Sequence, residues 1–147
     1  MCGLNGSLLW ISKTQLHLPY SIAVSPAGKI YVADLLTDCF YEYTSHGVLA
    51  NIIALYNRDN IGPYGFSIDS TGTWLVYNEV RHFKKNSVTN VEFSRSQKIF
   101  KLNIKSGVRH LIIEGPPTVF SIDIYQNKYL VLGTWHGLSL YDVSNIF

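Results

Sequence analysis

The chain has 147 residues, of which 47% are hydrophobic, 14% aromatic and 15% charged, and its formal net charge is +2. This hydrophobic content excludes an intrinsically disordered chain, and the length allows one ordinary domain with a real core. The small net charge gives no argument by itself for a nucleic-acid partner. The ten tyrosines, together with Ile and Val, favour strands over helices.

Two features of the sequence bear on its cellular compartment. Cys2 and Cys39 are too few and too far apart for a disulfide framework or a zinc site, so we expect free thiols. The N-terminus has no basic start and only a short apolar run. No apolar run approaches the roughly 20 residues that span a bilayer. We therefore expect a cytoplasmic protein without a membrane partner.

A similar segment begins at each of three prolines. The segments read PYSIAVSPAGKIYVAD from Pro19, PYGFSIDSTGTWLVYN from Pro63 and PTVFSIDIYQNKYLVLG from Pro117. Each combines an alternating apolar run, a turn and a second apolar run, which predicts a β-hairpin. Apolar residues coincide at two positions, which are Ile22, Phe66 and Phe120, and then Val24, Ile68 and Ile122.

The turns of the three hairpins are predicted by residue type. Gly28 and Gly72 coincide, and the third copy has Gln126 and Asn127 at this place. A type I turn followed by a left-handed residue fits the first two copies, because glycine has no steric cost there. Asp69 and Asp123 are expected to bond the turn backbone rather than to act as catalysts.

Further apolar runs follow the hairpins and complete units of about four strands. In the first unit the predicted strands are residues 20–25, 29–34, 39–44 and 48–55. Repeats of roughly 40 to 50 residues built from short strands are typical of propeller blades. We assign blade 1 to residues 19–55, blade 2 to residues 63–113 with an insertion at 79–97, and blade 3 to residues 117–147.

The first copy carries a family resemblance. Its pattern P-x-x-I-A-V-x-P-x-G-x-I-Y-V-A-D, followed by an aromatic strand and S-x-G, resembles the NHL repeat. It is also similar to blades of the six-bladed lactonase-like and strictosidine-synthase-like propellers. The resemblance implies a β-propeller and says little about activity. The second copy departs from the pattern through its insertion, and the third lacks the turn glycine.

Three blades are too few for a ring, which needs about four to eight. Residues 5–12 read as an outer strand without a blade of its own, and the third blade lacks its outer strand. We therefore expect an all-β partial propeller of about three four-stranded blades, completed to a six-bladed ring by dimerisation. Strand 7–12 of one chain would complete blade 3 of the other in a two-fold homodimer. The alternative is a fragment that assembles with other propeller fragments.

Loops at one end of the blades are the predicted ligand face, because a rigid scaffold usually carries function on its loops. The insertion begins NEVRHFKKNS, which suggests a basic lid for an anion or a nucleic-acid backbone, or otherwise a solvated loop. Trp135 could stack on a sugar, base or peptide, or pack between blades. The candidate ligand-binding residues are Arg58, Arg81, His82, Lys84, Lys85, Trp135 and His136.

Two classes of function follow from these residues. The first is a non-catalytic, cofactor-free module that binds or scaffolds a protein or peptide, with RNA as the second choice of partner. The alternative is a metal-dependent hydrolase of the lactonase or esterase type. Under that alternative the resemblance implies Ca²⁺ at the channel mouth, and Asp34, Asn78 and Glu79 offer suitable oxygens. Asp34 could equally cap the end of its strand.

Overall fold

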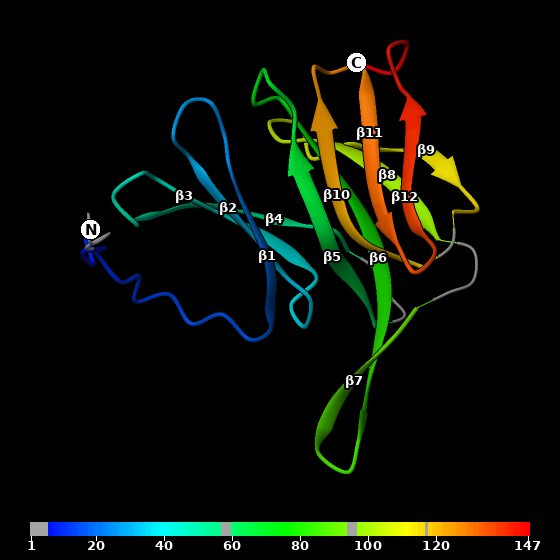
Figure 1. Ribbon diagram of the computed structural model, residues 1–147. Helices are drawn as coiled ribbons and strands as arrows, with labels where there is room; N and C mark the ends of the chain where they lie inside the picture. The colour runs from blue at the N-terminus through cyan, green and yellow to red at the C-terminus, as the bar shows by residue number, and fades with distance from the viewer. Residues whose placement is uncertain (1–5, 57–59, 94–96, 117) are drawn as a thin grey trace, which may run out of the picture.

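The computed structural model describes residues 6–56, 60–93, 97–116 and 118–147 (Figure 1). These residues form twelve strands and no helix. Accordingly, the described part of the chain contains no helix that could cross a membrane. The strands pair into three antiparallel sheets, which confirms the predicted all-β fold class.

Each sheet is a meander of strands that follow one another in the chain, and we call the sheets blades 1, 2 and 3. Blade 1 contains β1 (Pro19–Val24), β2 (Ile30–Asp34), β3 (Cys39–Tyr43) and β4 (Leu49–Ala54). Blade 2 contains β5 (Ile61–Ile68), β6 (Trp74–Lys85), β8 (Lys98–Asn103) and β9 (Arg109–Glu114), and β7 (Val88–Glu92) pairs with the far half of β6. Blade 3 contains β10 (Val119–Tyr125), β11 (Tyr129–Thr134) and β12 (Gly137–Asp142).

The blades stack face to face, with blade 2 between the other two (Figure 1). The first strand of blade 2, β5, contacts the first strands of both neighbours, β1 and β10. Two apolar clusters fill the joints between blades. The first joint buries Tyr31, Ala33, Phe40, Ile53, Leu55, Phe66, Leu75, Tyr77 and Leu102. The second joint buries Val76, Ile99, Val119, Ile122, Leu130, Leu132 and Val143.

The third hairpin stands two residues out of step with the predicted alignment. Its Ile122 pairs with Leu132, as Ile22 pairs with Val32 and Phe66 with Tyr77. Phe120 therefore does not coincide with Ile22 and Phe66 but lies two residues earlier. The proline was a poor anchor for the alignment, because the third copy has two more residues between its proline and the strand.

The turn predictions fare differently for the two aspartates. Asp69 is buried and accepts hydrogen bonds from the backbone N–H groups of Thr73 and Trp74, both at 2.8 Å, which confirms its role in the turn. Asp123 is exposed within β10 and accepts a bond from Ser67 Oγ at 3.2 Å, so its predicted turn role is wrong. The left-handed glycines are confirmed, with φ of +79° at Gly28 and +70° at Gly72. The third hairpin, which lacks the glycine, has left-handed backbone at Gln126 (+54°) and Asn127 (+51°) instead.

Two segments leave the regular blades. In the single chain, residues 6–18 form no strand. Leu16 packs on a small cluster of blade 1, and Trp10 Nε1 donates to the Ser45 carbonyl oxygen at 3.1 Å. The insertion is a β-hairpin of β6 and β7, which we call the arm (residues 81–92), and it projects away from the sheets (Figure 1). The strand-exchanged dimer stays a prediction, as does the division into domains.

Candidate functional site

One end of the three blades gathers the loops that were predicted to bind a ligand. In blades 1 and 3 the first strand begins opposite the end of the second, since Pro19 pairs with Asp34 and Val119 with Thr134. In blade 2 the first strand begins opposite Arg81, where the second strand continues into the arm. The connections into the first strands therefore lie beside those that follow the second strands. The arm leaves blade 2 at this end as well (Figure 1). We call this end the loop face.

A β-bulge interrupts the first strand of every blade at the loop face. The register shifts between Pro19 and Ser21 in β1, between Pro63 and Phe66 in β5, and between Val119 and Ser121 in β10. The bulged residues include an aromatic side chain in each case, namely Tyr20, Tyr64 and Phe120. Bulges re-aim side chains out of the pleat, and here they do so at the same place in all three blades.

These three rings belong to a continuous line of five aromatic side chains, which we call the aromatic row. Its members in spatial order are Tyr20, Tyr64, Phe93, Phe120 and Trp135. Successive ring centroids lie 4.6, 5.1, 5.1 and 5.8 Å apart. Trp135 is 76% exposed, Tyr20 43% and Phe120 38%, so the row presents aromatic surface to solvent. Burial, and then the neighbouring Tyr20, raise the pKa of Tyr64.

Buried polar side chains hold the backbone beneath this row. Asn78 Oδ1 accepts a bond from the N–H of Gly65 at 2.9 Å, and Asn78 Nδ2 donates to the carbonyl of Val119 at 3.1 Å. Gln97 Oε1 accepts the N–H of Val119 at 2.8 Å. Because Gly65 and Val119 adjoin Tyr64 and Phe120, these contacts fix the bulges that carry two of the rings. Sequence reasoning missed Gln97, since its partners are remote in the chain.

The basic residues of the insertion lie on the arm. Arg81 is paired with Glu92 across its two strands, and Lys84 and Lys85 stand near its tip. A groove of about 520 Å³ between the arm and blade 1 brings His82 and Lys84 together, and it is lined by His17, Leu36, Thr37, Asn60, His82, Phe83 and Lys84. Burial lowers the pKa of His82. The predicted lid is therefore an extended hairpin beside the row.

The other predicted ligand residues are placed as follows. Trp135 and His136 lie in the turn between β11 and β12, where the N–H of His136 donates to Thr134 Oγ1 at 3.3 Å. Trp135 belongs to the row, whereas His136 is exposed beside it. Arg58 lies outside the described residues. The structure thus places Trp135 among the aromatic side chains and the basic candidates on the arm.

The three oxygen-bearing residues of the metal hypothesis are each engaged by other groups of the protein. Asp34 is fully buried, and its carboxylate accepts the N–H groups of His17 at 2.7 Å and Leu18 at 3.0 Å. The side-chain oxygen of Asn78 accepts the N–H of Gly65 at the bulge of β5, and Glu79 forms an ion pair with Arg109. Among the described residues, no three His, Cys, Asp or Glu side chains converge on a common point. This donor set does not fit a shared calcium ion.

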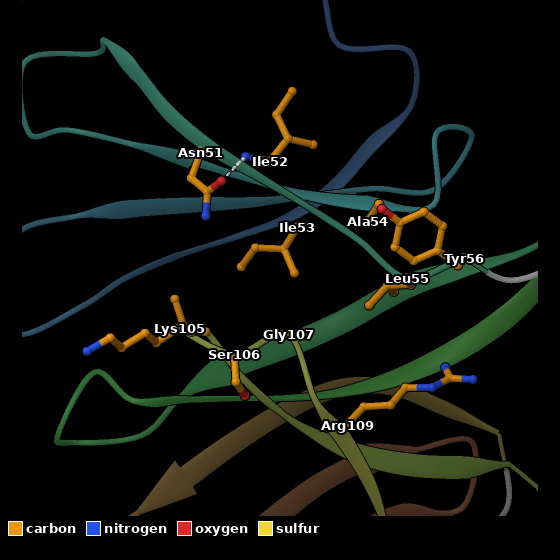
Figure 2. Close-up of a pocket in the computed structure, with 11 residues that line it drawn as sticks. Asn51, Ile52, Ile53, Ala54, Leu55, Tyr56, Lys105, Ser106, Gly107 and Arg109 are labelled. Atoms are coloured by element: carbon orange, nitrogen blue, oxygen red, sulfur yellow. Dashed lines mark hydrogen bonds between the residues drawn. The ribbon is translucent and has the colours of Figure 1, made fainter.

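A second hollow lies between blades 1 and 2 at their outer strands. Figure 2 shows this cleft of about 340 Å³ between β4 and the turn that joins β8 to β9. The Arg109 guanidinium at its edge lies 4.7 Å from the Phe100 ring, besides its ion pair with Glu79. Burial and the charge of Glu79 raise the pKa of the adjoining Tyr77. Arg109 is therefore already paired, which favours a structural role for it, and Lys105 is the other charged residue that lines the cleft.

An adjoining cleft of about 720 Å³ contains one further ion pair that the sequence did not suggest. Lys29 Nζ lies 2.7 Å from the carboxylate of the buried Glu42. Burial, together with this carboxylate, raises the pKa of Tyr31 to about 12. Cys39 is a free thiol, as predicted, and burial raises its pKa. None of these contacts brings a nucleophile beside a general base.

Comparison with known proteins gives only limited similarity. No protein-family model matches the chain. The CMP-N-acetylneuraminate-beta-galactosamide-alpha-2,3-sialyltransferase 2 proteins of Mus musculus and Rattus norvegicus are each 34% identical over 73 residues, covering 47% of this chain and 21% of theirs. A streptogramin B lyase structure matches with a TM-score of 0.40 and 14% identity, over 84% of this chain and 54% of that one. The chain therefore spans about a fifth of the curated proteins it matches.

Proposed function

We propose that the protein is a non-catalytic binding module, and that its ligand is an extended, proline-rich segment of another protein that lies across the aromatic row. The observation that carries this proposal is the row itself. Rings from all three blades are in contact with one another, and the end member, Trp135, is 76% exposed. Exposed aromatic side chains that touch one another in a line form a platform for a ligand, whereas aromatic residues that only fill a core would be covered.

An aromatic platform suits an extended peptide for two physical reasons. Tyr and Trp bury a large area at low entropic cost, because each has only two side-chain torsions. A proline-rich segment is already extended before it binds, with a rise of about 3.1 Å per residue, so residues two apart are about 6 Å apart. That spacing is comparable to the 4.6–5.8 Å steps between the rings of the row.

Single-stranded RNA is the competing partner, because bases also stack on aromatic side chains. Such binding depends on cations that follow the phosphate backbone. The members of the row are uncharged, and Arg81 on the arm stands opposite Glu92. Lys84 and Lys85 lie further toward the tip of the arm. The arrangement of charge therefore favours the peptide over RNA.

The test uses a fluorescein-labelled peptide of ten prolines, with binding followed by fluorescence anisotropy. We expect saturable binding that Trp135→Ala weakens by at least about tenfold, since truncating a tryptophan that anchors an interface typically costs about 2 kcal/mol or more and tenfold corresponds to about 1.4 kcal/mol. Trp135 is largely exposed, so the variant should fold. Phe83→Ala is the matched control, because Phe83 is an exposed aromatic residue on the arm and lies outside the row.

Two results would overturn the proposal. The first is that the peptide does not bind, or binds equally well to Trp135→Ala. The second is that a ten-residue poly-uridine RNA binds in preference, with an affinity that falls steeply with salt and drops in Lys84→Ala and Lys85→Ala. This second result would assign the loop face to nucleic acid.

A further inference from the structure

Equivalent positions in the three blades differ sharply in exposure, and the difference follows the order of the blades. Ile22 in blade 1 is equivalent to Phe66 in blade 2 and Ile122 in blade 3, because each pairs with the same position of the second strand in its own blade. Phe66 is 6% exposed and Ile122 8%, but Ile22 is 66% exposed. Val24, two residues on, is 59% exposed. We call this side of a blade, which faces the preceding blade, its front face.

On the opposite side of each blade, which we call its back face, the exposed residues belong to blade 3 instead of blade 1. Phe40 pairs with Ala33 in blade 1, Ile99 with Asn78 in blade 2, and Leu138 with Gly133 in blade 3. Phe40 and Ile99 are both fully buried, whereas Leu138 is 83% exposed and Leu140 65%. Each back face contacts the front face of the next blade inside the chain. Blade 1 and blade 3 lie on opposite sides of blade 2 (Figure 1). The outer face of blade 3 is exposed at Leu138 and Leu140, and that of blade 1 is exposed along β1. Further out on blade 1 this face is already covered, since Val32, Tyr41 and Tyr43 form a buried cluster on which Leu16 packs.

We propose that the open back face of blade 3 packs on the open front face of blade 1 in a second copy of this chain, and that two such joints close a two-fold ring of six blades. The internal joints are the argument for this occupant. They show that a back face and a front face of this repeat fit each other, and the two unpaired faces are one of each kind. A contact between a back face and a front face is head-to-tail, and it can close with two copies only when it forms twice.

The free edge of blade 3 lies at the same joint. Blades 1 and 2 have a fourth strand, β4 and β9, whereas the described part of blade 3 ends its sheet at β12. Residues 6–18 lie against the front face of blade 1 through Leu16, with Leu8, Leu9 and Ile11 largely exposed. In the ring this segment stands beside β12 of the second copy. An unpaired strand edge is a ready template for such an added strand.

Two charged substitutions at exposed positions test the ring without disturbing the interior of the chain. Light scattering after size-exclusion chromatography should give the mass of two chains for the wild type. Ile22→Asp alone and Leu138→Lys alone should each give one chain, because both joints of such a ring would bury an unpaired charge. Val88→Lys, at an exposed apolar residue of the arm, should leave the mass unchanged.

Mixing the two variants is the decisive measurement. A mixed ring has one native joint and one joint in which the carboxylate introduced by Ile22→Asp meets the ammonium group introduced by Leu138→Lys. An equimolar mixture should therefore regain the mass of two chains. A dimer that joins two identical faces would behave otherwise, since only one of the two variants would break it and mixing would rescue neither. The proposal would be overturned if only one of the two variants broke the dimer and mixing did not restore it. It would also be overturned if the wild type had the mass of one chain at all concentrations, or a mass above that of two chains.

Discussion

The two closed joints inside the chain and the two open faces at its ends are built from the same repeat positions. Phe40 and Ile99 fill the closed joints, and Leu138 occupies their position on the open back face. An apolar side chain is present in all three blades, but a covering blade is present in only two. The repeat pattern therefore determines which residues are apolar, and the neighbouring blade determines which of them are buried.

The largest test of this comparison is to truncate the same position in a closed joint and on an open face. Phe40→Ala should lower the free energy of unfolding by about 3–5 kcal/mol, because it leaves a cavity in the first joint. Leu138→Ala should change it by less than about 0.5 kcal/mol. Both are measured by urea unfolding in the Ile22→Asp background, which keeps the chains single. Equal costs at the two positions would show that Leu138 is covered within one chain.

The turns offer a second comparison between equivalent hairpins. Asp69→Ala should cost about 2–3 kcal/mol, because it removes the buried carboxylate that accepts the part-buried hydrogen bonds of the Thr73 and Trp74 N–H groups. Asp123→Ala, on the exposed strand of the third hairpin, should cost less than about 0.5 kcal/mol. Thermal unfolding of the two variants checks this difference. A comparable loss in both would mean that Asp123 contributes through its bond to Ser67.

What the sequence predicts well is whatever depends on near neighbours. Alternating apolar runs predicted the hairpins, and glycine predicted the left-handed residues in the turns of the first two copies. The two-residue shift of the third hairpin was missed, because strand period alone is unchanged by a shift of two. Within the predicted lid at residues 79–97, residues 81–85 and 88–92 are paired strands, which the polar composition of this segment did not indicate.

The candidate site was predicted only in part, for a related reason. The sequence predicts Trp135 as a possible stacking residue, but it identifies its partner Phe120 only as an apolar position of the repeat. Tyr20, Tyr64 and Phe93 come from strands or strand ends far apart in the chain, and the bulges that bring them together follow from pairing. Sequence spacing carries no record of such distant contacts. The basic cluster on the arm was more visible in sequence than the uncharged row.

The third comparison concerns the position opposite the start of each first strand, which holds Asp34, Glu79 and Thr134 in the three blades. Asp34→Ala should cost about 2 kcal/mol, because its carboxylate accepts backbone N–H groups of the preceding loop. We expect the melting temperature of the wild type to be the same with Ca²⁺ and with a chelator. Stabilisation by Ca²⁺ that is lost in Asp34→Ala or Asn78→Ala would favour the metal-dependent hydrolase instead.

The smallest expected effect concerns Tyr31 in β2. Val76 in blade 2 and Val131 in blade 3 are at the equivalent position, so only blade 1 has an ionisable side chain there. Burial and Glu42 raise the pKa of Tyr31 from 10.0 to about 12, so the folded chain retains a proton that the unfolded chain loses. The contribution of protonated Tyr31 to the free energy of unfolding is therefore fully present below pH 10 and is lost as the pH rises toward 12. By linkage, about 1.4 kcal/mol should be gone by pH 11. Urea unfolding at pH 8 and pH 11 measures this loss, and Tyr31→Phe should reduce it, because Phe does not ionise. An unchanged loss in Tyr31→Phe would mean that another group titrates in this range.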